Sequence, residues 1–304
     1  MKYLKNKLVV FSKKNFGLKY FSKKFLEILG AFSLVLNLLF LLNLLDENYF
    51  NKLEWKGFFL LIFPIIILSI FFTIIEFSKT QYTFKFKNLD SSIEIEINDF
   101  FNIDGNKIIP MNSSFDTNLK RIIESPNSIQ YYFQNNYYPD LTCFDNFIEK
   151  SIVENNIQEI DNNTNKEGKS KIYSIGTVVP VKDNNKKYNF YLLAHSNVNN
   201  DGTIESKTDY IDESLLKLWD YLSEQGTYNN YVIPLIGTGR CRLTVTRNEV
   251  IKKIIETFIV GVSSKKFTEK LIICIHPDDL KKIDLENILE FLDYKTKFFE
   301  HKRF

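Results

Sequence analysis

Several residue types are scarce in this chain, and each scarcity excludes a class of protein. Only three of the 304 residues are cysteines, and they form no Cys-x-x-Cys pair, which argues against a disulfide framework or a structural zinc site. Three histidines without ligand spacing on a helix face argue against a metalloenzyme, and we expect no metal and no cofactor. With 44% hydrophobic and 25% charged residues, the composition is that of a folded protein.

Neither sign of charge is in excess overall, but the charges are unevenly distributed. The 39 basic and 37 acidic residues give a net charge of +2. Residues 1–26 hold eight lysines and no acid, so the remainder carries a net charge of −6. We therefore expect no nucleic-acid partner, and we distinguish a basic N-terminal arm, residues 1–27.

Two apolar runs follow the arm. Residues 28–45 and 57–75 contain no charge over 18 and 19 residues, which meets the length criterion for a membrane-spanning helix. They predict a transmembrane helical hairpin, residues 28–75. The alternatives are a cleaved signal peptide for the first run and a buried core helix for the second. Because lysine-rich segments stay on the cytoplasmic side, a multi-pass protein of the cell (inner) membrane is expected, with its N-terminus and residues 78–304 in the cytoplasm.

Residues 78–304 show the pattern of an α/β domain with a mixed sheet flanked by helices. Alternating residues in 82–87 and 93–98 predict an antiparallel hairpin, and later apolar strands alternate with helices. Asp212 is expected to cap one helix, and Thr246 with Glu249 forms a capping box for the next. The Asn, Glu and Lys content of residues 151–171 predicts an exposed, mobile insert.

A short glycine-containing loop is the main candidate binding motif. The chain has only 11 glycines, yet Gly237 and Gly239 lie two apart, with Thr238 between them, after an apolar strand. Glycines let the backbone approach a ligand, clustered N–H groups can hold phosphate oxygens, and Arg240 could add a charged contact. The alternative is a tight turn with a surface arginine.

Two further positions follow the same logic. Gly176 lies in a second strand-associated Ile-Gly-Thr sequence, and Asp99 ends the strand of residues 93–98. An exposed Asp at a strand end could accept a hydrogen bond from an adenine amino group, or could simply be a turn residue.

In sequence order these elements resemble macro domains, which bind ADP-ribose. The resemblance covers approximately residues 91–292 and rests on INDFF at 97–101, IIPMN at 108–112 and VIPLIGTGRCRL at 232–243. It implies that Asp99 reads adenine, that residues 237–240 wrap the pyrophosphate, and that Asn112 lies beside the distal ribose.

The sequence departs from hydrolytic macro domains near the ribose. Those proteins have an Asn-Ala-Ala-Asn stretch followed by glycines, whereas here Asn112 is followed by Ser113, Ser114, Phe115 and Asp116. Hydrolysis is therefore not expected, and no catalytic residue is assigned. The substitutions suggest instead a pocket for a group attached to the ribose.

The whole architecture resembles the membrane-anchored macro effectors of bacterial Thoeris antiphage defence. The resemblance implies that a partner TIR-domain enzyme consumes NAD and makes an ADP-ribose derivative, in this subtype conjugated to histidine. Binding would favour a homo-oligomer that disrupts the lipid bilayer and damages the infected cell. The alternatives are a membrane-tethered ADP-ribosylhydrolase, in which Asn112 positions ribose and water, and a nucleotide-binding scaffold on a passive anchor.

Overall fold

The computed structural model describes residues 18–41, 55–77, 79–117, 128–164, 168–182, 188–201, 203–237 and 245–298. The chain divides into two compact units, Met1–Thr80 and Gln81–Phe304.

The described residues of the first unit form two helices, α2 (Leu18–Leu41) and α4 (Trp55–Phe77), which contact each other. In α4, the buried hydroxyls of Ser69 and Thr73 each donate a hydrogen bond of 2.6 Å to the carbonyl four residues earlier. These bonds satisfy polar groups that burial would otherwise leave without a partner. Several apolar side chains of α4, among them Phe63 and Phe71, are instead largely exposed.

The membrane prediction is not supported. Among the residues that the structure describes, no helix combines the length and the apolar character that a bilayer crossing needs. In α2 the charged residues Lys23, Lys24 and Glu27 precede the apolar run, of which the described helix holds residues 28–41. Residues 42–45 of the first predicted span lie outside the described part. The finding contradicts the predicted multi-pass location in the inner membrane, and with it the transmembrane hairpin and the bilayer as a partner lose their support.

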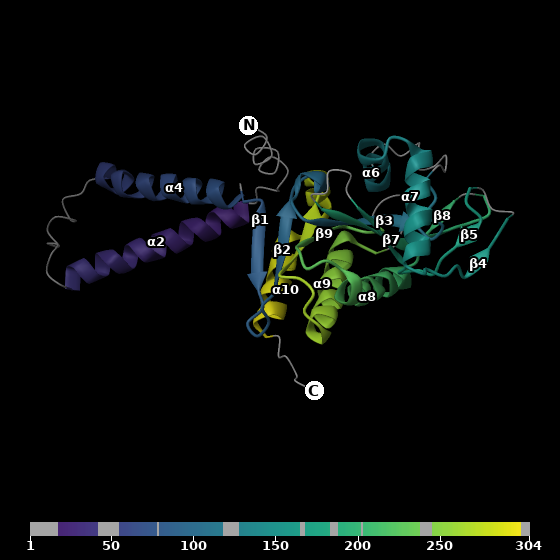
Figure 1. Cartoon of the computed structure of the whole chain (residues 1–304). Helices are drawn as coiled ribbons and strands as arrows, with labels where there is room; N and C mark the ends of the chain where they lie inside the picture. The colour runs from purple at the N-terminus through teal and green to yellow at the C-terminus, as the bar shows by residue number, and fades with distance from the viewer. Residues whose placement is uncertain are drawn as a thin grey trace. The chain divides into compact units, whose positions relative to one another are not determined.

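The second unit is built around one mixed sheet (Figure 1). In the described residues, eight strands belong to it, in the order β1-β2-β10-β9-β3-β7-β6, with β8 paired to β7. The strands β2, β10, β9, β3 and β7 run parallel, whereas β1, β6 and β8 are antiparallel to their neighbours. The strand bounds are β1 Gln81–Lys85, β2 Ser92–Ile97, β3 Asn106–Asn112, β6 Val178–Lys182, β7 Asn189–Val198, β8 Ile204–Glu205, β9 Tyr231–Pro234 and β10 Lys270–Ile275.

Helices pack on both faces of this sheet, which confirms the predicted mixed α/β fold. Helix α6 (Ile129–Tyr137) contacts β3 and α7 (Leu141–Glu154) contacts β6, while α8 (Thr208–Gln225) packs on β7 and on α9 (Arg247–Ser264). Helix α10 (Leu285–Lys297) lies beside α9 and β1. A small hairpin, β4 (Asp161–Asn162) and β5 (Lys171–Ile172), stands apart from the main sheet.

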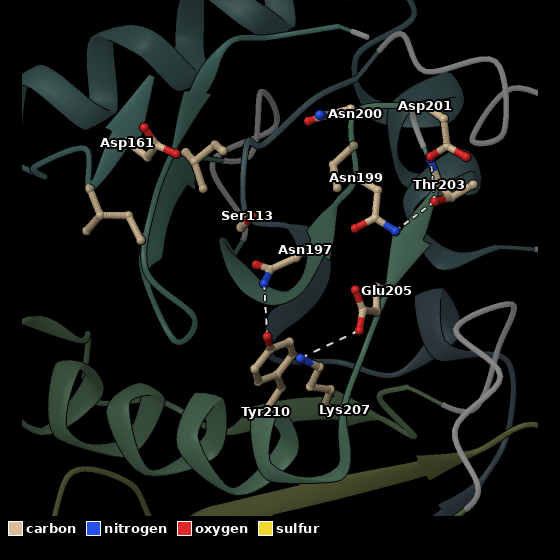
Figure 2. A pocket seen from close by; sticks show the side chains of 13 residues that line it. Ser113, Asp161, Asn197, Asn199, Asn200, Asp201, Thr203, Glu205, Lys207 and Tyr210 are labelled. Carbon is tan, nitrogen blue, oxygen red and sulfur yellow. Dashed lines mark hydrogen bonds and ion pairs between the residues drawn. The ribbon is translucent and has the colours of Figure 1, made fainter. Parts of the chain in front are cut away.

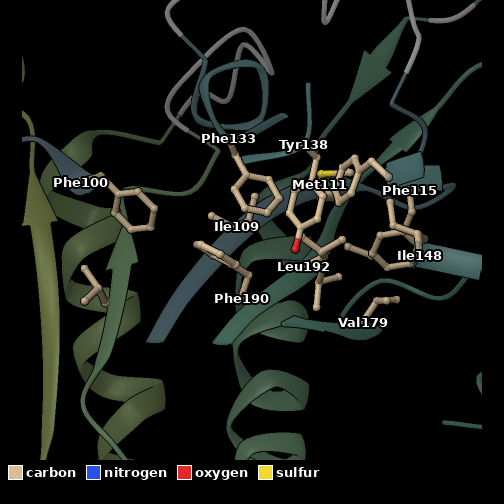
Figure 3. Close-up of a cluster of buried hydrophobic side chains, with 14 of the residues drawn as sticks. Phe100, Ile109, Met111, Phe115, Phe133, Tyr138, Ile148, Val179, Phe190 and Leu192 are labelled. Carbon is tan, nitrogen blue, oxygen red and sulfur yellow. The ribbon is translucent and has the colours of Figure 1, made fainter. Parts of the chain in front are cut away.

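Aromatic side chains dominate the core between the sheet and helices α6 and α7 (Figure 3). Phe133 of α6 lies 4.7 Å from Phe190 of β7, and Tyr138 stacks on Phe144 at 4.6 Å, both between ring centroids. Met111, at the end of β3, is fully buried in the same cluster. The core therefore fixes the end of β3 and the first half of β7 in place.

Two helix starts show what local sequence could specify. The predicted capping box at Thr246 is confirmed, because the Thr246 and Glu249 side chains bond reciprocally to each other's backbone N–H. The prediction for Asp212 is wrong: α8 begins at Thr208, and Asp212 lies within the helix, where it pairs with Lys253 of α9. The Asp212 carboxylate therefore forms an ion pair between two helices and does not cap a helix.

The contact between α8 and α9 depends on one glycine. A Cβ added to Gly261 would lie only 2.6 Å from the Cβ of Trp219, a completely buried side chain. We expect Gly261→Ala to lower the free energy of unfolding by about 1–3 kcal/mol, although alanine favours helix. In the matched variant Gly30→Ala, nothing lies within 4 Å of the added Cβ, so the free energy should not fall. Urea unfolding of both variants checks this, and an unchanged Gly261→Ala protein would contradict it.

Candidate functional site

The parallel strands place their carboxyl ends along one edge of the sheet. From β3 the chain crosses toward β7, whereas from β9 it crosses the other way, to β10. Open α/β sheets bind ligands outside the strand ends at such a point, where neighbouring connections diverge. The fold therefore places the candidate site at the carboxyl ends of β3 and β9.

Most of the predicted site residues that the structure describes follow these strand ends. Asp99 comes shortly after β2, Ser113 and Ser114 directly after β3, and Gly237 shortly after β9. Asn112 is the last residue of β3. The structure thus brings these residues to one edge. Thr238, Gly239 and Arg240 lie outside the described residues.

Gly176 is also near this edge, in the turn before β6. Its N–H donates to the carbonyl of Ala194 on β7 at 2.8 Å. Its φ of +86° is a backbone conformation that residues other than glycine rarely adopt. An added Cβ would meet the Lys217 side chain at 2.5 Å. Gly176 is therefore explained by the turn and by its packing on α8.

The carboxylate of Asp99 is held in a fixed orientation. Its Oδ1 accepts a hydrogen bond from the Phe101 N–H at 2.9 Å and caps a short 3₁₀ helix, η1 (Phe100–Asn102). The Asn98 side chain supports it, since its oxygen accepts from the Asp99 N–H and its amide donates to buried Glu96, both at 2.8 Å. A half-buried, pre-oriented carboxylate is suited to accept a hydrogen bond from a ligand.

Asn112 organises the loop that follows β3. Its Oδ1 accepts hydrogen bonds from the N–H groups of Ser114 and Asp116, and its Nδ2 donates to the Asp116 carbonyl, all at 3.1 Å. Phe115 is held at a φ of +47° with its ring fully buried. Both ends of the Asn112 amide therefore shape the loop.

A second layer of side chains fixes the same loop. The buried amides of Gln130 and Gln134 donate to the carbonyls of Asp116 and Thr117 at 2.9 and 2.8 Å. The Lys169 N–H donates to the Asp116 carboxylate at 2.5 Å, and its Nζ lies 2.7 Å from Asp145. The loop is thus rigidly supported from helices α6 and α7 and from the segment before β5.

Two hydroxyls of this loop are buried without a partner. Ser113 and Ser114 are only 1% and 2% exposed, and within the described part of the chain neither Oγ has a hydrogen-bond partner. Leaving a buried hydroxyl unpaired is costly, so each calls for a partner that the described residues do not supply.

A pocket of about 730 Å³ opens beside Ser113 (Figure 2). Its walls come from the end of β7, from β8, from the start of α8 and from the β4–β5 hairpin. Asn197 on one wall donates to the Tyr210 hydroxyl at 3.0 Å. Polar and apolar atoms share the lining about equally, and its charged side chains are Asp161, Asp201, Glu205 and Lys207.

Several of these supports carry no local sequence signal. Gln130, Gln134 and Lys169 act through contacts between distant segments. Asn98 acts through its neighbours in the sequence, and no motif marks it either. The pocket wall of β4 and β5 falls in or next to the stretch predicted as a mobile insert, whose mobility stays a prediction.

His195 on β7 lies beneath this edge and is buried. Its Nδ1 donates to the Met111 carbonyl at 2.9 Å, and burial lowers the pKa of the ring from 6.5 to about 4, outweighing that hydrogen bond. Between pH 6.5 and 4, His195 therefore binds a proton in the unfolded chain but stays neutral in the folded chain. The free energy of unfolding falls as the pH drops through this range.

We expect the free energy of unfolding to be about 2 kcal/mol lower at pH 5 than at pH 7.5 because of His195 alone. Urea unfolding of His195→Gln should show a smaller drop than the parent. His276 has a side chain that is 54% exposed, and the matched variant His276→Gln should lose as much free energy of unfolding between pH 7.5 and pH 5 as the parent does. An equal drop in parent and His195→Gln would contradict this assignment.

A mixed α/β sheet with polar loops gathered where its connections diverge is the architecture of a ligand-binding α/β domain. The family model described as Thoeris protein ThsA, Macro domain, matches residues 93–276, more than half of the chain, and the chain belongs to this family. The Thoeris protein ThsA of Bacillus amyloliquefaciens (strain Y2) is 28% identical over 235 residues, which are 74% of this chain and 76% of that protein.

Solved structures with a similar fold include macrodomains of Oceanobacillus iheyensis. The one with ADP is 13% identical, covers 71% of this chain and 100% of its own, and has a TM-score of 0.49. A mutant macrodomain with ADPR is 10% identical, covers 69% of this chain and 99% of its own, and has a TM-score of 0.47. The family assignment rests on the family model and not on these weak overlaps.

Proposed function

We propose that this chain is the signal sensor of a Thoeris antiphage system and that its macro domain binds an ADP-ribose derivative, such as histidine-ADP-ribose. A TIR-domain enzyme that consumes NAD would supply the signal. Membership of the ThsA macro family supports binding of an ADP-ribose-derived signal in antiphage defence.

The observation that carries the proposal is the order of the loops along the sheet edge. Asp99 follows β2, Gly237 follows β9 and Asn112 ends β3, with β10 between the first two. Three strand steps of about 4.8 Å span roughly 14 Å, the scale of an extended dinucleotide-like ligand. We assign adenine to Asp99, the diphosphate to the turn that begins at Gly237, and the distal ribose to the Asn112 loop.

The backbone around Gly237 favours phosphate binding. Its φ of +71° lies in the left-handed region, where successive N–H groups can converge on an anion. We extend the diphosphate assignment to Thr238, Gly239 and Arg240, which complete the same motif. Recognition by backbone N–H groups requires no catalytic residue, so we propose a sensor and not an enzyme.

Signalling requires that the ligand bind two states of the protein unequally. We propose that the bound state favours self-association. The exposed apolar side chains of α4, such as Phe63 and Phe71, are candidates for the contact.

Two measurements on the full chain test the proposal. ADP-ribose at 100 times its own Kd should stabilise the fold by about 2.7 kcal/mol. AMP and ribose 5-phosphate at the same concentration should stabilise it less. Light scattering should show a larger species with histidine-ADP-ribose than without it. No stabilisation by any ADP-ribose compound would contradict binding, and an unchanged mass would contradict assembly. Release of free ADP-ribose from an ADP-ribosylated protein would favour the hydrolase alternative.

A further inference from the structure

The two outer strands of the main sheet, β1 and β6, differ in how their outer edges are used. Among the described strands, each of them pairs with one neighbour only. The other side of such a strand presents backbone N–H and C=O groups to which a strand of another chain can bond, and most proteins block this edge.

The edge of β6 is blocked. Pro180, in the middle of the strand, has no N–H, and its carbonyl accepts a hydrogen bond from the Ser151 hydroxyl of α7 at 2.6 Å. The carbonyl of Lys182, at the end of the strand, accepts from the Tyr138 hydroxyl. A proline and two side chains therefore remove the groups that a further strand would need.

The hydrogen-bond pattern shows which groups of β1 point outward. Residues of an antiparallel strand bond alternately to the neighbour on one side and to whatever lies on the other. The Phe86 N–H donates to the Ser91 carbonyl at 3.2 Å, which places the bonds to the β2 side at the even-numbered residues. Gln81, Thr83 and Lys85 therefore direct their backbone groups away from β2.

The bonds of β2 agree with this assignment and show that the edge of β1 is open. Ser92 lies opposite Lys85, and its N–H donates to the Glu269 carbonyl beside β10 at 2.9 Å, away from β1. Within the described residues, no other segment accepts a hydrogen bond from the three outward N–H groups. All three residues are exposed, and no proline interrupts the strand.

The sequence of β1 is complementary to itself. When two copies pair antiparallel about a two-fold axis at Thr83, Gln81 of each lies opposite Lys85 of the other, and all three outward-pointing residues form hydrogen-bonded pairs. Tyr82 then lies opposite Phe84, an aromatic pair that stabilises antiparallel sheets. The two Lys85 residues are four positions apart, roughly 13 Å along the strand, so their charges are largely screened.

The charge next to the edge also favours this pairing. The Thr83 hydroxyl donates to Glu94 at 2.7 Å, so the side chains of Gln81, Thr83 and Lys85 lie on the same face as the acidic residues of β2. On that face Gln81 is paired with Glu96. Lys85 of a second copy, opposite Gln81, would approach the Glu96 carboxylate, to which it is attracted.

Exposed aromatic side chains lie close to the end of the open edge. Helix α10 contacts β1, and its Thr296 carbonyl accepts a hydrogen bond from the Lys87 N–H at 3.4 Å, two residues beyond the strand. Near this bond Tyr294 and Phe298 are 61% and 69% exposed, and their ring centroids lie 5.1 Å apart. Apolar surface beside an open strand edge is typical of a contact with another chain.

We propose that two copies of this chain pair through their β1 strands, antiparallel and centred on Thr83, so that one sheet continues into the other. This dimer needs no ligand, and the inference therefore goes beyond the proposed function. Assembly on ligand binding would use a different surface.

Sedimentation equilibrium of the full chain without ligand tests the pairing, and we expect a reversible monomer–dimer equilibrium. Thr83→Pro removes the outward N–H of each copy and thus two hydrogen bonds between them, so the dimer Kd should rise about 5- to 150-fold. Thr83→Val keeps the N–H and the branched shape and should leave the Kd nearly unchanged. A monomer at every concentration, or equal Kd values for Thr83→Pro and the parent, would overturn the proposal.

Charge substitutions test the register even if Thr83→Pro fails to fold. Gln81→Lys places a lysine opposite Lys85 at both ends of the pairing and should raise the dimer Kd roughly 2- to 30-fold. Adding Lys85→Glu makes both pairs oppositely charged and should restore the dimer. A double variant as weak as Gln81→Lys alone would refute this pairing. Thermal unfolding establishes that each variant is folded.

Discussion

Replacing Asp99 by alanine lowers the affinity of the full chain for ADP-ribose by roughly 10- to 150-fold. The carboxylate is half-buried and fixed by the Phe101 and Asn98 contacts, so a hydrogen bond from the adenine amino group would form without reorganisation. A hydrogen bond to a charged group contributes about 1.5–3 kcal/mol, which corresponds to this range. Calorimetry with the parent and the variant measures the loss.

The nucleobase provides the control for this prediction. Inosine diphosphate ribose lacks the adenine amino group and should bind the parent more weakly by a similar factor, while Asp99→Ala should no longer distinguish the two bases. Asp99→Asn keeps an oxygen that can cap η1, so it separates loss of charge from loss of the cap. An alanine variant that still prefers adenine as strongly as the parent would contradict the role of Asp99.

Replacing Gly237 by valine abolishes measurable binding of ADP-ribose, a loss of at least about 100-fold. A β-branched residue is a strong outlier at the observed φ of +71°, so the turn after β9 must change conformation. Its N–H groups would then no longer converge on the diphosphate. Because Gly237 is buried beside the core residue Ile236, the fold of the variant must be checked separately.

Asparagine at the same position is the matched control. Asn tolerates the left-handed region better than other side chains, so Gly237→Asn should retain more affinity than Gly237→Val. Circular dichroism and thermal unfolding establish that both variants are folded. If the valine variant binds like the parent, this turn does not hold the diphosphate.

The sequence predicted those features that depend on local pattern. Alternation in residues 82–87 and 93–98 predicted the β1–β2 hairpin, whose register pairs Tyr82 with Ile95. Reciprocal bonding between Thr246 and Glu249 needs only three residues of separation, and the helix start was confirmed. Asp212 also had the chemistry of a cap, but Lys253 from another helix determines its role.

Features that depend on distant contacts could not be predicted. The sequence shows Ser113 and Ser114 as substitutions, but the burial of their hydroxyls without a partner among the described residues depends on how Asn112, Gln130 and Gln134 hold the loop. The pocket joins β7 and β8 to the β4–β5 hairpin, and their polar composition resembles that of any exposed loop. The apolar runs 28–45 and 57–75 predicted membrane spans from their length, yet among the described residues no helix is long and apolar enough to cross a membrane.

We propose that the sheet edge from Asp99 to the Asn112 loop binds an ADP-ribose compound. Titration calorimetry of the full chain with ADP-ribose and histidine-ADP-ribose measures this binding. We expect saturable heat with one ligand per chain, and its loss in Gly237→Val. An absence of saturable heat with both compounds, from protein shown to be folded, would contradict it.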